Sequence, residues 1–284
     1  IGYLVSKGVV TPEEVKERSY YFLELLESGD ESVRLDAWRY VPELVEKGVI
    51  SIDEVKERKR FFLELLESDF ISIKRGAWRS IVTLVDKGVI TRDDSIFFLK
   101  LLESDDEPNR LDAWSRVSYL IDKGVITPKE SKGYLQEPFE GESNKAILTV
   151  NDVKEKRQFF FELLKSERED IRLRAWWILG DLIKSAIITR EDSGFFLELL
   201  DYPNESVRLN AWENIGYLVS KGVVTPEEVK ERSYYFLELL ESSHVRVRRK
   251  AWEIAGALIG KGIIAREILC GGPTDWGAKG RTRR

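Results

Sequence analysis

Apolar residues recur along the chain with the spacing of one helix face, and each recurrence is centred on the dipeptide Ala-Trp. With the Ala as position 0, apolar residues occupy positions 0, +1, +4, +7 and +8, which share one side of a helix with 3.6 residues per turn. The six dipeptides are separated by 40, 36, 62, 36 and 40 residues and begin at Ala37, Ala77, Ala113, Ala175, Ala211 and Ala251. The pattern predicts six similar helices, called B helices below, and a repeat architecture.

The residues between the B helices predict a second helix in each repeat. Eleven residues after the Ala stands a Gly in five repeats and Ala186 in the fourth, followed by Val or Ile, which is typical of a left-handed helix stop. A Thr or Ser with an acid three residues on then opens the next helix, called the A helix, as in the capping box of Thr11 and Glu14. The helix pairs are predicted at 11–47, 51–87, 91–124, 149–186, 189–222 and 225–262. The predicted fold class is all-α, a right-handed α-α superhelix of about six helix pairs.

One stretch of the sequence occurs twice, because residues 1–28 are identical to residues 215–242. We interpret 1–8 as a partial repeat at the start of an array that covers 1–265. The two repeats of 36 residues lack four residues of the A helix, close to one helical turn, so their apolar register survives. Two segments break the array: a polar insertion at 128–148 and an irregular C-terminal tail at 266–284. The insertion is interpreted either as a functional loop or as a tolerated one.

Segments such as DESVRLDAW (30–38) and NESVRLNAW (204–212) resemble the HEAT repeat, in which an acid and Val-Arg precede the Ala of the second helix. The resemblance implies a HEAT/armadillo-like solenoid. It also implies that the base at position −3 forms a ladder between repeats with acids at the turns, here Asp30, Glu31 and Asp170. HEAT repeats usually carry a Pro in the A helix. These repeats do not, so we expect straighter A helices.

The charge distribution narrows the choice of partner. The net charge is −5, yet residues 243–284 hold ten Lys/Arg against three Asp/Glu, which leaves −12 on residues 1–242. A protein that grips duplex DNA needs a basic surface, so nucleic acid is not the expected partner. The local basic cluster contains Arg246, Arg248, Arg249 and Lys250. We interpret it as a solvated end of the array, because Arg248 belongs to the recurring frame.

The amino-acid composition indicates the source and the cellular compartment to expect. Cys270 is the single cysteine, so an intrachain disulfide is excluded. Met is absent and charged residues make up 33% of the chain, a composition typical of thermophiles. We expect a thermophilic archaeal source and a cytoplasmic location. No apolar run reaches the length of a membrane span, and no signal peptide is visible.

The Ala-Trp tryptophans lie at the edge of the apolar stripe and are predicted to pack against the neighbouring repeat. Function is therefore expected on the opposite side of the B helices, at positions −2, +2, +6 and +9, which HEAT solenoids expose on their concave surface. Trp177 is the most informative residue of this face, because Trp176 already fills the packing position. Exposed aromatics flanked by Leu are typical of protein-binding hot spots. The predicted partner-binding residues are Leu111, Tyr119, Leu173, Trp177, Asp181, Leu209 and Tyr217.

We therefore predict a non-catalytic scaffold that binds a peptide or helix of a partner protein in its concave groove, with no cofactor, metal, membrane or small-molecule substrate. Phosphate loops, nucleophile elbows and Cys/His metal spacings are missing from the sequence, and His244 is the single histidine. An acidic groove edge (Asp122, Asp181, Glu213) favours a basic or amphipathic partner.

Two alternatives stay open. The same aromatics would also serve to cover backbone or pack locally. A HEAT-like nucleic-acid-binding protein or alkylpurine-type DNA glycosylase is the other class, because such glycosylases use concave tryptophans and an Asp, and Trp177 and Asp181 lie one turn apart.

Overall fold

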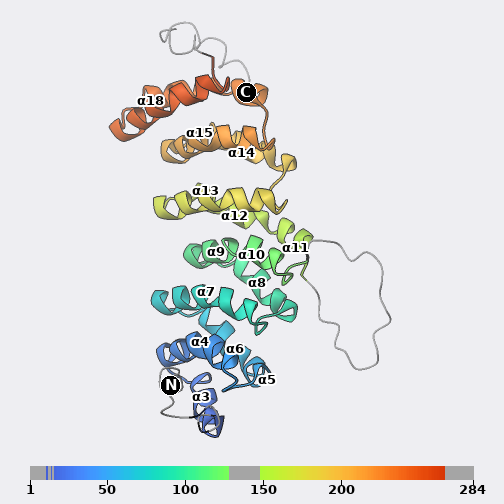
Figure 1. Ribbon diagram of the computed structural model, residues 1–284. Coiled ribbons are helices and arrows are strands. Elements are labelled where there is room, and N and C mark those ends of the chain that lie inside the picture. Colours follow the sequence, from blue (N-terminus) through green and yellow to red (C-terminus); the bar gives the residue numbers. More distant parts are fainter. Residues whose placement is uncertain (1–10, 12–13, 15, 128–147, 266–284) are drawn as a thin grey trace, which may run out of the picture. The chain divides into compact units, whose positions relative to one another are not determined.

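The computed structural model describes residues 11, 14, 16–127 and 148–265. Within these residues the structure is helical and holds no strand (Figure 1). The chain divides into two compact units, Ile1–Lys156 (unit 1) and Arg157–Arg284 (unit 2). The predicted all-α solenoid class is confirmed. The predicted partial repeat at 1–8, the tail at 266–284 and all but the last residue of the insertion at 128–148 lie outside the described residues.

Unit 1 is built from helix pairs in which A and B segments pack side by side (Figure 1). Its A segments are α3 (Ser19–Leu25), α5 (Ile52–Lys56), α6 (Lys59–Leu65), η1 (Arg92–Asp94), α8 (Ser95–Leu102) and α11 (Val150–Glu155). Its B segments are α4 (Glu31–Glu46), α7 (Ile71–Asp86), α9 (Glu107–Trp114) and α10 (Val117–Asp122). The third B helix is thus divided in two.

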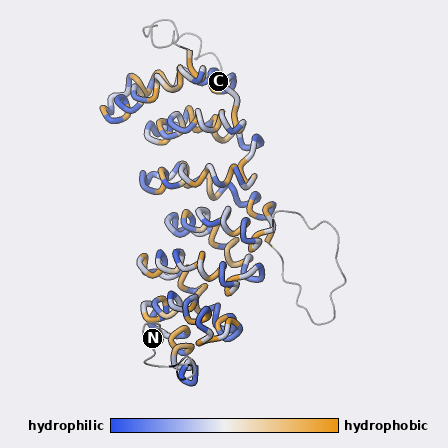
Figure 2. The backbone as a smooth tube through the Cα atoms, in the orientation of Figure 1, coloured by the Kyte–Doolittle hydropathy of each residue, from blue (hydrophilic) through white to orange (hydrophobic). Residues whose placement is uncertain are grey.

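Unit 2 repeats the arrangement. Its A segments are α12 (Arg157–Lys165), η2 (Arg190–Asp192), α14 (Ser193–Leu199), α16 (Pro226–Lys230) and α17 (Ser233–Leu240). Its B helices are α13 (Glu169–Lys184), α15 (Glu205–Ser220) and α18 (Val245–Gly260), which lie next to one another in that order. Figure 2 shows apolar and polar residues alternating along each helix, as the amphipathic pattern requires.

The A helices are broken rather than straight, so this expectation was wrong. In the second repeat the A helix ends with α5 and starts again at α6. The break needs no proline, because Arg58 Nη1 donates a hydrogen bond to the Glu54 carbonyl at 2.8 Å. Arg232 and the Glu228 carbonyl repeat this contact at 3.3 Å. A side-chain donor satisfies the backbone acceptor that the break would otherwise leave free.

The B helices end, and the A helices begin, at the residues that the sequence pattern predicted. The stop residues adopt the left-handed conformation at Gly48, Gly88, Gly124, Gly222 and Gly262, and also at Ala186, with φ 55°. Reciprocal capping boxes open the A helices at Ser51, Thr149 and Thr225. In the two short repeats, where four residues are missing, the first A segment shrinks to the 3₁₀ turns η1 and η2. The four missing residues therefore shorten the first A segment of these repeats and not the second.

Five of the six Ala-Trp tryptophans are buried in the core, as predicted. For Trp38, Trp78, Trp176 and Trp212 the ring packs on a Phe of the following A helix, with centroid distances of 5.3 Å for Trp38–Phe62 and 5.1 Å for Trp212–Phe236. Trp212 Nε1 also donates to the Leu200 carbonyl at 3.1 Å, which ties the B helix to the A helix of its own repeat. Trp252 departs from the prediction, because it is 52% exposed. In the part of the chain that is described, no following A helix covers it.

The base at −3 is buried at Arg34, Arg110, Arg172 and Arg208, but its partners differ from the predicted acids. Arg34 bonds to the Ser28 carbonyl at 3.2 Å and pairs with Glu64 of the next A helix at 3.7 Å. Of the expected acids, only Glu31 lies near Arg34, at 3.8 Å. Asp30 caps α4 instead, and Asp170 pairs with Arg168. Lys74, the base of the second repeat, does pair with a turn acid of the next repeat, Asp106, at 2.7 Å. The bases therefore use acids of the neighbouring A helix in some repeats and a turn acid in another.

Candidate partner-binding surface

The two predicted site residues of unit 1 serve packing. Leu111 is fully buried, so it is not part of an exposed groove. At the same position of the first repeat, Leu35 is buried against the next B helix of unit 1, since a Cβ added to Gly76 would meet Leu35 at 2.5 Å. Tyr119 is half-buried and its hydroxyl donates to the Val82 carbonyl at 2.9 Å. Burial, and then Asp86, raise the pKa of Tyr119 to about 12, which keeps the phenol neutral.

In unit 2 the predicted partner-binding residues differ in how far their side chains are exposed. Leu209 is buried and Leu173 half-buried between the B helices. Tyr217 is half-buried, and its hydroxyl lies where a Cβ on Gly180 would be, so the aromatic covers backbone of α13. Trp177 is different, because it is 78% exposed although it sits on a well-packed helix.

Asp181 has no environment suited to catalysis. Its side chain is exposed and pairs with Lys184 Nζ at 3.0 Å, and this pair raises the pKa of Lys184. A glycosylase-type role for Trp177 and Asp181 would need an Asp held beside a substrate cavity. The geometry gives that alternative no support.

The first turns of α13, α15 and α18 enclose a hollow of about 370 Å³ in unit 2. Two predicted residues, Leu173 and Leu209, contribute to its wall together with Val247. The other lining residues are polar or charged: Glu169, Arg172, Ser206, Asn210, Glu213, Arg246, Arg249, Lys250 and Glu253. Sequence reasoning found the two leucines and missed most of the polar lining.

A chain of hydrogen bonds fixes the floor of this hollow. Arg172 is buried and donates from Nε to Asn210 Oδ1 at 2.6 Å. Asn210 in turn donates from Nδ2 to Glu213 Oε2 at 3.1 Å, which holds the Glu213 carboxylate towards the hollow. Burial lowers the pKa of Arg172, an effect that the charge of Glu169 opposes. The sequence signal that could have revealed this floor is a polar residue at position −1, here Asn210, two residues after the recurring base at position −3.

Ion pairs form the rim of the hollow. Arg246 of α18 makes two hydrogen bonds to Glu169 of α13, at 2.6 and 3.1 Å. Lys250 lies between Glu213 at 3.4 Å and Glu253 at 3.6 Å. The basic cluster therefore faces acids rather than forming a free anion site. Arg248 is the exception, because it belongs to the frame and bonds to the Ser242 carbonyl.

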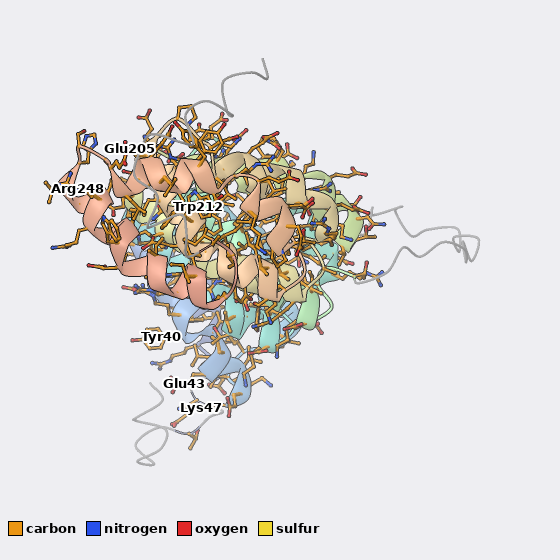
Figure 3. All side chains as sticks on the ribbon, turned by 90° about the horizontal axis from the view of Figure 1, so that it is seen from above. Tyr40, Glu43, Lys47, Glu205, Trp212 and Arg248 are labelled. Carbon is orange, nitrogen blue, oxygen red and sulfur yellow. The ribbon has the colours of Figure 1, made fainter. Side chains whose placement is uncertain are left out.

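Figure 3 places Trp212 among the helices of unit 2, with Glu205 and Arg248 towards its edge. In unit 1, Tyr40 and Glu43 of α4 are followed by Lys47, the residue after the end of that helix (Figure 3), and Tyr40 is 59% exposed. Exposed aromatics thus occur on both units, but Trp177 is the most exposed of those described.

These features define an α-helical repeat protein built as a solenoid. Similar solved structures are the archaeal HEAT-like repeats protein from Thermococcus onnurineus NA1 (16% identity, TM-score 0.40, 89% of this chain and 98% of that chain) and the designed armadillo repeat protein YIII(Dq)4CqI (15%, 0.36, 84% and 98%). A third is the designed armadillo repeat protein YIII(Dq.V1)4CPAF in complex with the peptide (KR)4 (14%, 0.37, 84% and 98%). No protein-family model and no curated protein matches the sequence. At these identities the likeness concerns architecture alone.

Among the described residues, no helix combines the length and apolar character that crossing a membrane requires. The same residues hold no group of three or more His, Cys, Asp or Glu side chains arranged to bind a metal ion.

Proposed function

We propose that the chain is a non-catalytic interaction scaffold that holds a peptide or helix of a partner protein on the B helices of unit 2, with Trp177 as the anchor. The observation that carries this proposal is the 78% exposure of Trp177 on a helix whose other side is fixed by Trp176 in the core. A large aromatic held rigidly on a surface loses little entropy when a partner covers it, which is why Trp is enriched in binding hot spots.

The charges beside Trp177 favour a partner segment that combines apolar and basic residues. Positions +2 of the two following B helices carry Glu213 and Glu253 instead of aromatics. A partner cation would compete for these carboxylates with Lys250, which lies 3.4 Å or more from each of them. Such pairs add orientation and association rate more than affinity, so binding is expected to weaken with salt.

The test begins with affinity capture of a partner protein and then measures the Kd of the isolated pair. Trp177→Ala is expected to weaken binding at least tenfold, or about 1.4 kcal/mol, with the melting temperature nearly unchanged. Tyr40→Ala removes an exposed aromatic from unit 1 and serves as the matched control. If Trp177→Ala binds as tightly as the parent, or if Tyr40→Ala loses as much affinity, the proposal for this surface is wrong.

A further inference from the structure

The start of helix α7 departs from the sequence pattern of the other B helices. Positions −7 and −6 hold Asp-Glu in the first and third repeats, and position −6 is again Glu in the fourth and fifth. In α7 these positions hold Phe70 and Ile71, whose side chains are 67% and 62% exposed. Both lie within the array, with α4 before them and α9 after them in unit 1, so their exposure is not that of a chain end.

The turn that leads into α7 does not require an apolar residue at Phe70. Ser68 Oγ accepts a hydrogen bond from the Phe70 N–H at 3.1 Å. The same bond closes this turn in the fourth and sixth repeats, where Arg168 and His244 take the place of the Phe. Ser68 also donates to Glu31 of α4, which ties the turn to the preceding B helix. Phe70 is therefore a large exposed aromatic on a fixed backbone, and covering it costs little entropy.

Two arginines continue the exposed stripe along α7. Arg75 and Arg79 follow Ile71 at intervals of four residues, which places all three on one side of the helix. Both arginines are exposed, and among the described residues neither has a carboxylate partner. Lys74 beside them differs, because it pairs with Asp106 of the next repeat at 2.7 Å. The exposed stripe thus joins two apolar side chains to two unpaired guanidinium groups.

This part of unit 1 is basic although the chain as a whole is acidic. Helix α7 holds no acid before its last residue. A third guanidinium group lies against it, since a Cβ added to Gly76 would lie 2.7 Å from Arg39 Nη2 of α4. Arg39 is neutralised by Asp36 at 2.7 Å, whereas Arg75 and Arg79 are not. Unpaired guanidinium groups on a chain with a net charge of −5 favour a partner that supplies the missing carboxylates.

We propose that unit 1 carries a docking surface of its own, for an acidic segment of a protein partner that also carries apolar side chains. The surface, called the α7 surface below, consists of Phe70, Ile71, Arg75 and Arg79. Carboxylates of the segment pair with the two guanidinium groups, and its apolar side chains cover the two apolar residues. Nucleic acid is disfavoured, because two arginines are too few for the many phosphate contacts that hold it. The inference does not rest on the proposed function, because Trp177 belongs to unit 2.

The test is fluorescence anisotropy with the full chain and three labelled peptides of equal length. The acidic peptide carries leucines and, one helical turn further on, glutamates four positions apart; the other two peptides replace each Glu by Gln or by Lys. The parent is expected to bind the acidic peptide at least about tenfold more tightly than the Gln peptide, and less tightly as the salt concentration rises. A parent that does not distinguish these two peptides overturns the proposal.

Substitutions that restore the ordinary repeat sequence separate binding from folding. Phe70→Asp combined with Ile71→Glu gives α7 the Asp-Glu start of the first and third repeats. The melting temperature is expected to stay the same or to rise, because Asp caps a helix better than an apolar residue does. The same double variant is expected to bind the acidic peptide at least about tenfold more weakly than the parent. Unchanged affinity for the acidic peptide contradicts the α7 surface.

Charge reversal gives a result that misfolding cannot imitate. Arg75→Glu combined with Arg79→Glu is expected to lose the acidic peptide and to prefer the Lys peptide. The matched control is Arg60→Glu, which reverses an exposed charge on α6 of the same unit and should bind as the parent does. Trp177→Ala should also bind as the parent does, which keeps this test apart from that of the partner site in unit 2.

Three outcomes of these measurements overturn the proposal. In the first, Arg60→Glu loses as much affinity for the acidic peptide as the reversal of Arg75 and Arg79, so that net charge alone decides binding. In the second, the reversed variant does not change its preference between the acidic and Lys peptides. In the third, a labelled single-stranded oligonucleotide binds the parent as tightly as the acidic peptide does, so that the surface selects polyanions and not a protein segment.

Discussion

The tryptophan packing between repeats leads to a quantitative prediction for Trp212. Its side chain is fully buried, contacts the Phe236 ring, and donates a hydrogen bond to the Leu200 carbonyl. Truncating a buried Trp to Ala costs about 3–5 kcal/mol, because the apolar contacts are lost and a cavity remains. The unpaired carbonyl adds about 1 kcal/mol. Trp212→Ala is therefore expected to lower the free energy of unfolding by about 4–6 kcal/mol.

Urea unfolding followed by far-ultraviolet circular dichroism measures this loss. With a slope of about 2 kcal/mol per molar urea, the midpoint of the transition involving unit 2 should fall by about 2–3 M. Trp177→Ala is the matched control, because it removes the same side chain from an exposed site of unit 2 and should change stability by about 0.5 kcal/mol or less. Equal midpoints for Trp212→Ala and Trp177→Ala would refute the packing role assigned to Trp212.

Three further predictions concern stability. Trp114→Ala, at a site 1% exposed, should cost about 3–5 kcal/mol, measured by the same unfolding curves. Ala186 adopts φ 55°, so Ala186→Gly should raise stability by about 1 kcal/mol in thermal melts, whereas Gly222→Ala should lower it by a similar amount; equal signs would contradict this account. The hydrogen bond from Arg190 lowers the pKa of Glu228 from 4.5 to about 2. A folded-state pKa below the unfolded one means that Glu228 stabilises fully above about pH 4.5 and loses this effect as the pH falls towards 2, so the stability deficit of Glu228→Gln should shrink over that window.

The repeat frame was predictable because it depends on local rules. The 3.6-residue period, the left-handed stop at Gly and the capping boxes each involve residues a few positions apart, and the structure has them where the sequence indicated. The broken A helices were missed although their cause is also local. The Arg58 side chain donates to the Glu54 carbonyl. An Arg at this position could equally extend into solvent, and the period of apolar residues does not tell which of the two occurs.

The binding surface was harder to predict, because exposure depends on the neighbouring repeat. Helical period places Leu111 and Trp177 on the same face, yet one is fully buried and the other 78% exposed. Leu35 shows how a −2 residue is buried within unit 1: the backbone of the next B helix comes so close at Gly76 that an added Cβ would lie 2.5 Å from the Leu35 side chain. The pair of Arg246 and Glu169 is 77 positions apart, so no local pattern could have joined them.

The insertion point after the third repeat has a consequence for engineering. Thr127 N–H donates to the Leu148 carbonyl at 3.0 Å, and Val150 N–H donates to the Thr127 carbonyl at 2.9 Å. These two bonds hold together the ends between which residues 128–147 are inserted. The chain leaves and re-enters the helical array at one clamped point, so the number of residues in between does not set the register of the repeats. This junction is a natural graft site: a short linker, an epitope or a whole reporter domain placed between Thr127 and Leu148 should leave the helices on either side unchanged.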